Sequence, residues 1–97
     1  MSDDAAPGAA RAALEIRNRL GLHARAAVLL VQTAGRFDAE VMVEKDGQVV
    51  NGRSIMGIMM LAAEQGSTID VTATGPQAGE AVEAIRALVE SRFNEPE

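Results

Sequence analysis

The chain has 97 residues, 47% of them hydrophobic, which is enough apolar content for one small domain with a single modest core. It contains no cysteine, so disulfides and thiolate metal sites are excluded. Its formal net charge of -5 argues against nucleic acid as a main partner, because a phosphate backbone attracts a basic surface.

The N-terminal residues and the apolar runs favour a soluble cytoplasmic protein. Residues 1–4 (MSDD) are acidic and lack the basic-then-apolar order of a secretory signal. The longest apolar run, residues 26–31, is far shorter than the roughly 20 residues that a membrane span needs. We therefore expect no direct insertion into a membrane.

The first predicted elements are a tail, a strand and a helix. Residues 1–11 are small, polar and acidic, which is typical of a disordered tail. Apolar and polar residues alternate over 14–17, which predicts a strand with one buried face. Gly21 interrupts this pattern, and residues 24–34 then have the apolar spacing of a helix that stops at Gly35.

A hairpin and a short helix are predicted next. Residues 39–44 alternate as a second strand, and Asp46-Gly47 favours a two-residue turn in which both positions have positive φ. Val49-Val50 follows as a third strand. Ser54 can then cap a short helix over residues 55–62.

The last predicted elements are a strand and an amphipathic helix. Residues 69–74 alternate as a fourth strand, and Gly75-Pro76 begins a helix with i, i+3, i+4, i+7 apolar spacing. The residues after Phe93 are predicted to be a frayed acidic end. We thus expect one domain over residues 12–93, with residues 94–97 as a C-terminal tail.

The predicted element order is βαββαβα. Every strand with a clear pattern is apolar on one side only, which fits an antiparallel sheet with one solvated face. Three helices, each with one apolar stripe, can cover the other face. The sequence therefore predicts an α+β fold, a two-layer open-faced sandwich.

His23, the only histidine, lies at the predicted start of the first helix, two residues before Arg25. A helix start offers unpaired N–H groups and the positive end of the helix dipole to an anion. Imidazole is a nucleophile whose charge changes near neutral pH, and arginine binds phosphate through two hydrogen bonds. This combination predicts a site that accepts a phosphoryl group.

Other chemistry at His23 is poorly supported by its neighbours. One histidine without cysteines or a carboxylate cluster does not make a zinc site, and we expect neither a metal nor a cofactor. No pattern places an aspartate and a nucleophile beside it as in a hydrolytic triad.

Ser54 and the methionines of the short helix each allow two interpretations. The Ser54 hydroxyl can serve only as a helix cap, or it can also carry a phosphate, which a helix start tolerates. Met56, Met59 and Met60 can fill a core that lacks large aromatic residues, or they can stay exposed as an adaptable docking surface.

Two segments resemble the signatures of HPr, the histidine phosphocarrier family of the bacterial phosphoenolpyruvate-dependent phosphotransferase system. Residues 21–27 (GLHARAA) resemble its active-site segment, and residues 53–57 (RSIMG) resemble its second signature around a regulatory serine. The resemblance extends over about residues 14–93. Residues 18–21 (NRLG) and 73–77 (ATGPQ) look more like the nitrogen-related branch, NPr, than the sugar branch.

The resemblance implies a sheet with strand order 1-4-2-3 and a phosphoryl site at His23. His23 would take a phosphoryl group on Nδ1 from enzyme I and pass it to an enzyme IIA. Arg25 would steady the group, and the backbone amides of Ala24 and Arg25 would complete its cradle. The protein would then be a relay without enzymatic turnover.

The resemblance also implies a partner surface and a regulatory site. Leu22, Ile55, Met56 and Met59 would belong to the docking surface of a monomer. Ser54 would be modified by an HPr kinase/phosphorylase where the host has one.

Ala26 departs from the family pattern, because most members have proline directly after the arginine. Proline in the first turn pre-sets φ, whereas alanine is a strong helix former with one more free amide. We expect the site to survive this difference, with a less rigid first turn and altered exchange rates.

Three functional hypotheses follow from the sequence. The leading one is a phosphocarrier that relays phosphoryl groups through His23, in a nitrogen-related or regulatory system or in the sugar-transport branch. The second is a regulatory interaction protein that is switched by phosphorylation at Ser54. The third is a generic ligand-binding domain in which His23 has no special role.

Overall fold

The computed structural model describes residues 8–97. Its elements follow the order βαββαβα and end in a short 3-10 turn, η2. In chain order they are β1 (Ala9–Glu15), α1 (Ala24–Gly35), β2 (Glu40–Lys45), β3 (Gln48–Asn51), α2 (Ile55–Met60), β4 (Thr68–Thr74), α3 (Ala78–Glu90) and η2 (Arg92–Asn94).

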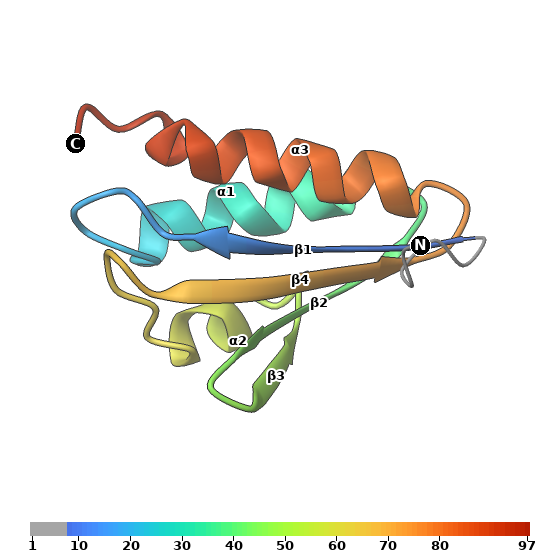
Figure 1. The fold of residues 1–97 in the computed structure, drawn as a ribbon, viewed down its shortest axis with the longest axis horizontal. Helices are drawn as coiled ribbons and strands as arrows, with labels where there is room; N and C mark the ends of the chain where they lie inside the picture. The colour runs from blue at the N-terminus through green and yellow to red at the C-terminus, as the bar shows by residue number, and fades with distance from the viewer. Residues whose placement is uncertain (1–7) are drawn as a thin grey trace.

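The strands form one four-stranded antiparallel sheet in the order β1-β4-β2-β3. β4, the last strand of the chain, lies between β1 and β2, with Leu14 opposite Ile69 and Val43 opposite Val71. Figure 1 shows α1 and α3 side by side over one face of this sheet. The predicted fold class, element order and strand order are confirmed.

One aliphatic core lies between the sheet and the helices. On β4, Ile69, Val71 and Ala73 are buried while Thr72 and Thr74 on the opposite face are exposed. The facing helices contribute their apolar stripes, and the resulting cluster joins α1, α2 and α3 to the sheet. The other sheet face is left to solvent, as the alternating pattern predicts.

Most element boundaries lie within a few residues of those predicted, and the start of β1 and the end of α2 call for explanation. β1 begins at Ala9, inside the segment expected to be a tail, because residues 9–15 pair along their length with residues 68–74 of β4. The inward positions at this end are alanines, whose small side chains give a weak alternating signal. The rest of the expected tail, residues 1–7, lies outside the described residues. α2 ends at Met60, before Ala62 adopts a left-handed φ of 52°.

Among the helices of residues 8–97, none has the length and apolar character that crossing a membrane requires.

Candidate functional site

His23 is the N-cap of α1, with extended backbone angles of φ -74° and ψ -178°. Its carbonyl oxygen accepts a hydrogen bond from the backbone N–H of Ala27 at 2.8 Å, which opens the helix. Its imidazole makes no capping bond within the described chain and is 28% exposed. Since the first N–H groups of a helix have no acceptor inside it, those of Ala24 and Arg25 can serve an anion beside the ring.

Gly21 fixes the approach of the chain to His23. Its φ is 68°, and its backbone is so close to the loop after α2 that an added Cβ would lie 2.4 Å from the carbonyl oxygen of Ala63. The same oxygen accepts a hydrogen bond from the Leu22 N–H at 2.9 Å. A side chain at Gly21 has no room, so glycine allows the turn that exposes the start of α1.

Arg25 lies beside the imidazole and is held by the C-terminal end of the chain. Its Nη1 donates to the carbonyl oxygen of Phe93 at 3.1 Å and to Oε2 of Glu95 at 2.9 Å. The Arg25 side chain is 51% exposed, so it remains accessible from solvent. The structure thus brings His23 and Arg25 together around one anionic group, the Glu95 carboxylate.

Glu95 is the first of two residues of this site that the sequence did not predict. Its Oε2 is 2.5 Å from Nε2 of His23, and its Oε1 accepts from Nδ2 of Asn18 at 3.0 Å. The side chain is only 12% exposed. Burial raises the pKa of this carboxyl, but the hydrogen bonds from His23 and Asn18 and the charges of His23 and Arg25 outweigh it. They hold the pKa of Glu95 below its ordinary value of 4.5.

Asn18 is the second residue that was missed as part of the site. It is fully buried, and its Nδ2 also donates to the carbonyl oxygen of Gly21 at 2.8 Å. It therefore ties the turn before His23 to the end of the chain. The sequence offered little to predict this contact, because no local pattern links Asn18 to an acidic residue 77 positions later.

The C-terminal residues fold back onto the site, which corrects the expectation of a frayed end. The chain turns at Arg92, Phe93 and Asn94, which all adopt left-handed φ values of 59°, 54° and 61°. Phe93 is fully buried in the core and anchors this turn. The reversal places Glu95 on the site, and it lets Glu97 pair with Arg19 at 2.8 Å. Opposite charges hold a segment that looks unstructured in the sequence.

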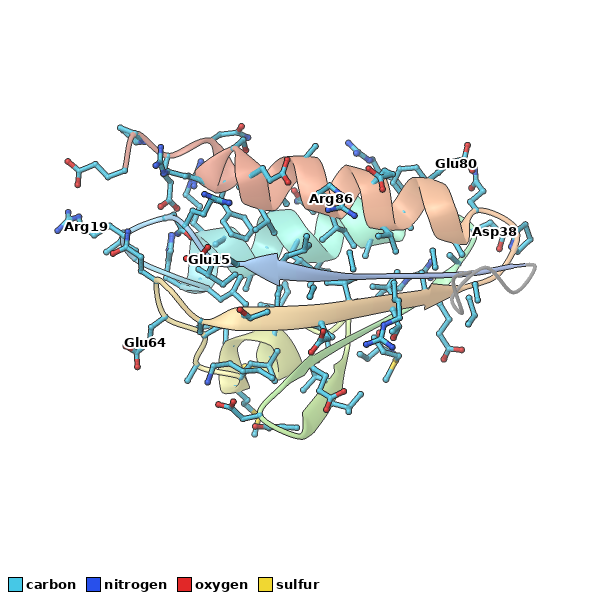
Figure 2. The ribbon with its side chains drawn as sticks, viewed as in Figure 1. Glu15, Arg19, Asp38, Glu64, Glu80 and Arg86 are labelled. Atoms are coloured by element: carbon cyan, nitrogen blue, oxygen red, sulfur yellow. The ribbon has the colours of Figure 1, made fainter. Side chains whose placement is uncertain are left out.

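The figures show where these parts lie. In Figure 1 the C-terminus is at the end of the molecule where the connection from β1 to α1 turns. Figure 2 labels Arg19 at this end, and Asp38 and Glu80 at the opposite end. The site is therefore formed by the β1–α1 connection, the start of α1 and the C-terminal residues.

Ser54 is the N-cap of α2, and its Oγ accepts a hydrogen bond from the Gly57 N–H at 3.0 Å. The predicted capping role is therefore confirmed. Ser54 as a residue is partly exposed at the start of this helix.

The exposed apolar surface of α2 agrees with the docking interpretation of the methionines. Met56 and Met60 are 69% and 64% exposed, and Met59 and Ile55 are each 39% exposed. A short helix buries one side, here Ile58, and leaves the other side chains in solvent.

Leu22, which was expected in the docking surface, is 5% exposed and belongs to the core. The bond from its N–H to Ala63 fixes the chain with this side chain directed inward. Leu20, two residues earlier, is 61% exposed at the same end of the molecule as His23. The burial of Leu22 corrects the expectation that its side chain is part of an exposed docking surface.

Within residues 8–97 no three histidine or acidic side chains gather in an arrangement suited to a metal ion.

Comparisons with known proteins fit this geometry. A family profile described as "PTS HPr component phosphorylation site" matches residues 10–91. The phosphocarrier protein HPr of Cupriavidus necator is 49% identical over 82 residues, covering 84% of this chain and 92% of that protein. The HPr-like protein Crh of Halalkalibacterium halodurans is 48% identical over 77 residues, covering 79% of this chain and 92% of that protein.

Solved structures agree as well. The crystal structure of HPr-C-His from Thermoanaerobacter tengcongensis has a TM-score of 0.87 and 45% identity, covering 91% of this chain and 99% of that chain. The resemblance carried by residues 21–27 and 53–57 is thereby confirmed over nearly the whole described chain.

Proposed function

Because this chain belongs to the HPr family of phosphocarrier proteins, we propose that it relays a phosphoryl group through His23, from enzyme I to an enzyme IIA. The observation that carries the proposal is the position of His23, a partly exposed imidazole at the start of α1 beside the guanidinium of Arg25. A relay has to release its cargo, and an exposed helix start suits this better than a deep pocket. The protein itself has no turnover, since its partners supply the remaining catalytic groups.

The phosphoryl group is proposed to go onto Nδ1 of His23. Nε2 is engaged by the Glu95 carboxylate at 2.5 Å, so the other ring nitrogen is the one left for an incoming phosphorus. Arg25 and the backbone N–H groups of Ala24 and Arg25 would hold the phosphoryl oxygens. A guanidinium and a helix start are both groups that bind phosphate well.

The partner surface is proposed to consist of the exposed apolar residues near this end of the molecule. Met56 and Met59 on α2 supply flexible side chains that can fit more than one partner. Ile55 and Leu20 add further exposed apolar area. The same surface would serve enzyme I and enzyme IIA in turn, while the protein works as a cytoplasmic monomer.

The relay is tested by incubating the protein with phosphoenolpyruvate and a cognate enzyme I. We expect acid-labile phosphate on the wild-type protein and on Ser54→Ala, and none on His23→Ala. Labelling of His23→Ala at the wild-type level would overturn the proposal, and so would an unlabelled wild-type protein.

The branch of the phosphotransferase system is proposed to be the nitrogen-related one, on the strength of residues 18–21 and 73–77. The sugar-transport branch is the alternative. Phosphorylated protein offered a nitrogen-type and a sugar-type enzyme IIA should lose its phosphate faster to the nitrogen-type acceptor. Faster loss to the sugar-type acceptor would assign the other branch.

A regulatory role at Ser54 is a second candidate, because the chain is also 48% identical to an HPr-like protein named Crh. Ser54 lies at the start of α2, next to the exposed methionines, so a phosphate there would add roughly 2 negative charges to the partner surface. ATP and an HPr kinase/phosphorylase should give acid-stable labelling that Ser54→Ala abolishes. No labelling with a host-matched kinase would remove this candidate.

A further inference from the structure

We propose that the exposed methionines of α2, Met56, Met59 and Met60, form a peroxide-sensitive modification site. Oxidation of their thioethers to sulfoxides weakens the binding of partners and leaves the fold and His23 unchanged. The proposal rests on the proposed function, since it concerns the surface through which the phosphocarrier would meet enzyme I and enzyme IIA. It adds a control of docking by oxidation that requires no change at the phosphoryl acceptor.

Methionine supplies all of the sulfur in this protein. The 97 residues include five methionines and no cysteine, so no thiol competes with the thioethers for an oxidant. Most protein responses to peroxide use a cysteine thiolate, and this chain has none to offer. Three of the five methionines lie in α2, whose sequence is IMGIMM. A response to peroxide at sulfur is therefore concentrated on one six-residue helix.

The two sides of α2 have different environments. Residues three and four apart share one side of a helix, so Met56 lies next to Met59 and Met60. All three side chains are exposed, Met56 and Met60 the most. The opposite side faces the core, where Ile58 and Leu61 are buried. An oxidant in solution thus reaches the methionine side of this helix without any opening of the fold.

The contacts that hold α2 in place do not use the methionine side chains. Ser54 caps the helix through the Gly57 N–H, and its carbonyl oxygen accepts from the Ile58 N–H at 3.0 Å. The side chains of Ile58 and Leu61 join the helix to the core. New polar atoms on the exposed side leave these contacts intact. Oxidation should therefore change the surface and not the free energy of unfolding.

The reaction that we propose is a two-electron oxidation by hydrogen peroxide. A sulfur lone pair of the thioether attacks one peroxide oxygen, so the sulfur–oxygen bond forms as the oxygen–oxygen bond breaks. The second oxygen leaves as water with both hydrogen atoms. Sulfur is oxidised, peroxide is reduced, and no further reactant is needed. Methionine sulfoxide can be reduced again by enzymes specific for each of its epimers, so the modification is reversible.

A sulfoxide changes what this surface can bind. The thioether is flexible and apolar, which suits an interface that several partners share. The sulfoxide is polar, and its oxygen needs a hydrogen-bond donor. An apolar interface that buries this oxygen without a donor loses about tenfold or more in affinity. The expected effect on phosphotransfer is therefore a higher KM for the carrier with an unchanged kcat.

Met42 on β2 provides an internal comparison. It lies opposite Asn51 of β3 and Thr72 of β4, so it has a neighbouring strand on each side. It is less exposed than the methionines of α2. Since side chains alternate along a strand and Val41 and Val43 are buried, Met42 faces away from the helices. Peroxide should react with it more slowly than with α2, and its oxidation should not affect docking.

The first experiment maps the order of oxidation in the full-length protein. The protein is treated with graded hydrogen peroxide, the peroxide is destroyed with catalase, and tryptic peptides are analysed by mass spectrometry. Trypsin separates residues 37–45, which contain Met42, from residues 54–86, which contain all three methionines of α2. Fragmentation of the second peptide should show added oxygen first at Met56 and Met60. Oxidation of Met42 as fast as these two would overturn the selectivity of the site.

The second experiment measures phosphotransfer from enzyme I to untreated and oxidised protein, after the peroxide has been removed. Oxidised wild type should have KM raised about tenfold or more, with kcat and Tm unchanged. A triple variant, Met56→Leu with Met59→Leu and Met60→Leu, keeps the apolar volume and should have the same KM before and after treatment. The matched control Met42→Leu should behave like wild type. Reduction by methionine sulfoxide reductases should restore the original KM.

The outcomes separate this proposal from the proposed function. An unchanged KM in protein whose α2 methionines are fully oxidised would overturn it, and so would an equal rise in the triple variant. A lower kcat at unchanged KM, or a lower Tm, would show that oxidation acts on His23 or on the fold and would overturn it as well. If untreated wild type accepts no phosphate from enzyme I, the relay itself fails, and the effect of oxidation on docking falls with it.

Discussion

Replacing Gly21 with alanine is expected to destabilise the turn before His23 through two separate effects. Gly21 has a φ of 68°, where a Cβ costs roughly 1–2 kcal/mol. The new Cβ would also lie 2.4 Å from the Ala63 carbonyl oxygen and 3.1 Å from the Cα of Glu64. Both neighbours are backbone atoms, so relief requires a shift of the chain, which costs about 1–3 kcal/mol more.

The expected loss in the free energy of unfolding is thus roughly 2–5 kcal/mol. This is a large part of the roughly 5–15 kcal/mol that stabilises a typical domain. For a domain of this size, each 1 kcal/mol lowers Tm by about 4–8 °C. Gly21→Ala should therefore melt well below the wild-type protein, and because Ala63 also binds the Leu22 N–H, the shift should disturb the position of His23.

Gly47→Ala is the matched control for this prediction. Gly47 also has a positive φ, 84°, but no atom lies within 4 Å of the Cβ that alanine would add. Gly47→Ala should therefore lose only the stability that a Cβ costs at a positive φ, without the further cost of a close contact. Urea unfolding followed by circular dichroism gives both values, and their difference measures the contact with Ala63. Equal losses in the two variants would refute the reasoning about this close approach.

Three further predictions concern other parts of the molecule. Ala62 has a left-handed φ of 52°, so Ala62→Gly should raise stability by about 1 kcal/mol; a lower Tm would contradict this. Ser54→Ala removes the cap on the Gly57 N–H and should lower the free energy of unfolding by about 1 kcal/mol. Ser54→Asp should keep most of this stability, because aspartate also caps helices. Identical melting of both variants would exclude a capping contribution. Because the pKa of Glu95 is lower in the folded state, its carboxylate stabilises the fold above about pH 4.5, and this contribution is lost as pH falls through the folded pKa. Stability should therefore fall less steeply on acidification in Glu95→Gln than in wild type, and parallel pH profiles would refute this assignment.

The features that could be predicted are those with local causes. Asp46 and Gly47 both have positive φ, as the predicted two-residue turn requires, because the steric preference lies in the two residues themselves. The same is true of the Ser54 cap, which joins a side chain to a backbone group three residues away. The position of His23 before α1 also followed from a local break at Gly21.

The features that were missed depend on partners far away in the chain. Glu95 bonds to a histidine 72 positions earlier, and no period or turn signal connects the two. The start of β1 at Ala9 is set by pairing with Thr74, not by the alanine-rich sequence around it. Leu22 and Leu20 have the same chemical character, and only the backbone turn at Gly21 decides which of them is buried.

The strand order also determines when the site around His23 can assemble during synthesis of the chain. Within residues 8–97, β1 has β4 as its neighbour in the sheet, and β2, β3 and two helices are translated between them. Pairing between strands so distant in sequence is slow to nucleate. β1 therefore cannot take its place in the sheet before β4 has been made. A nascent chain would carry His23 long before Glu95 leaves the ribosome. The contacts of His23 and Arg25 with Glu95 would then form only after the C-terminal residues of the domain have been made.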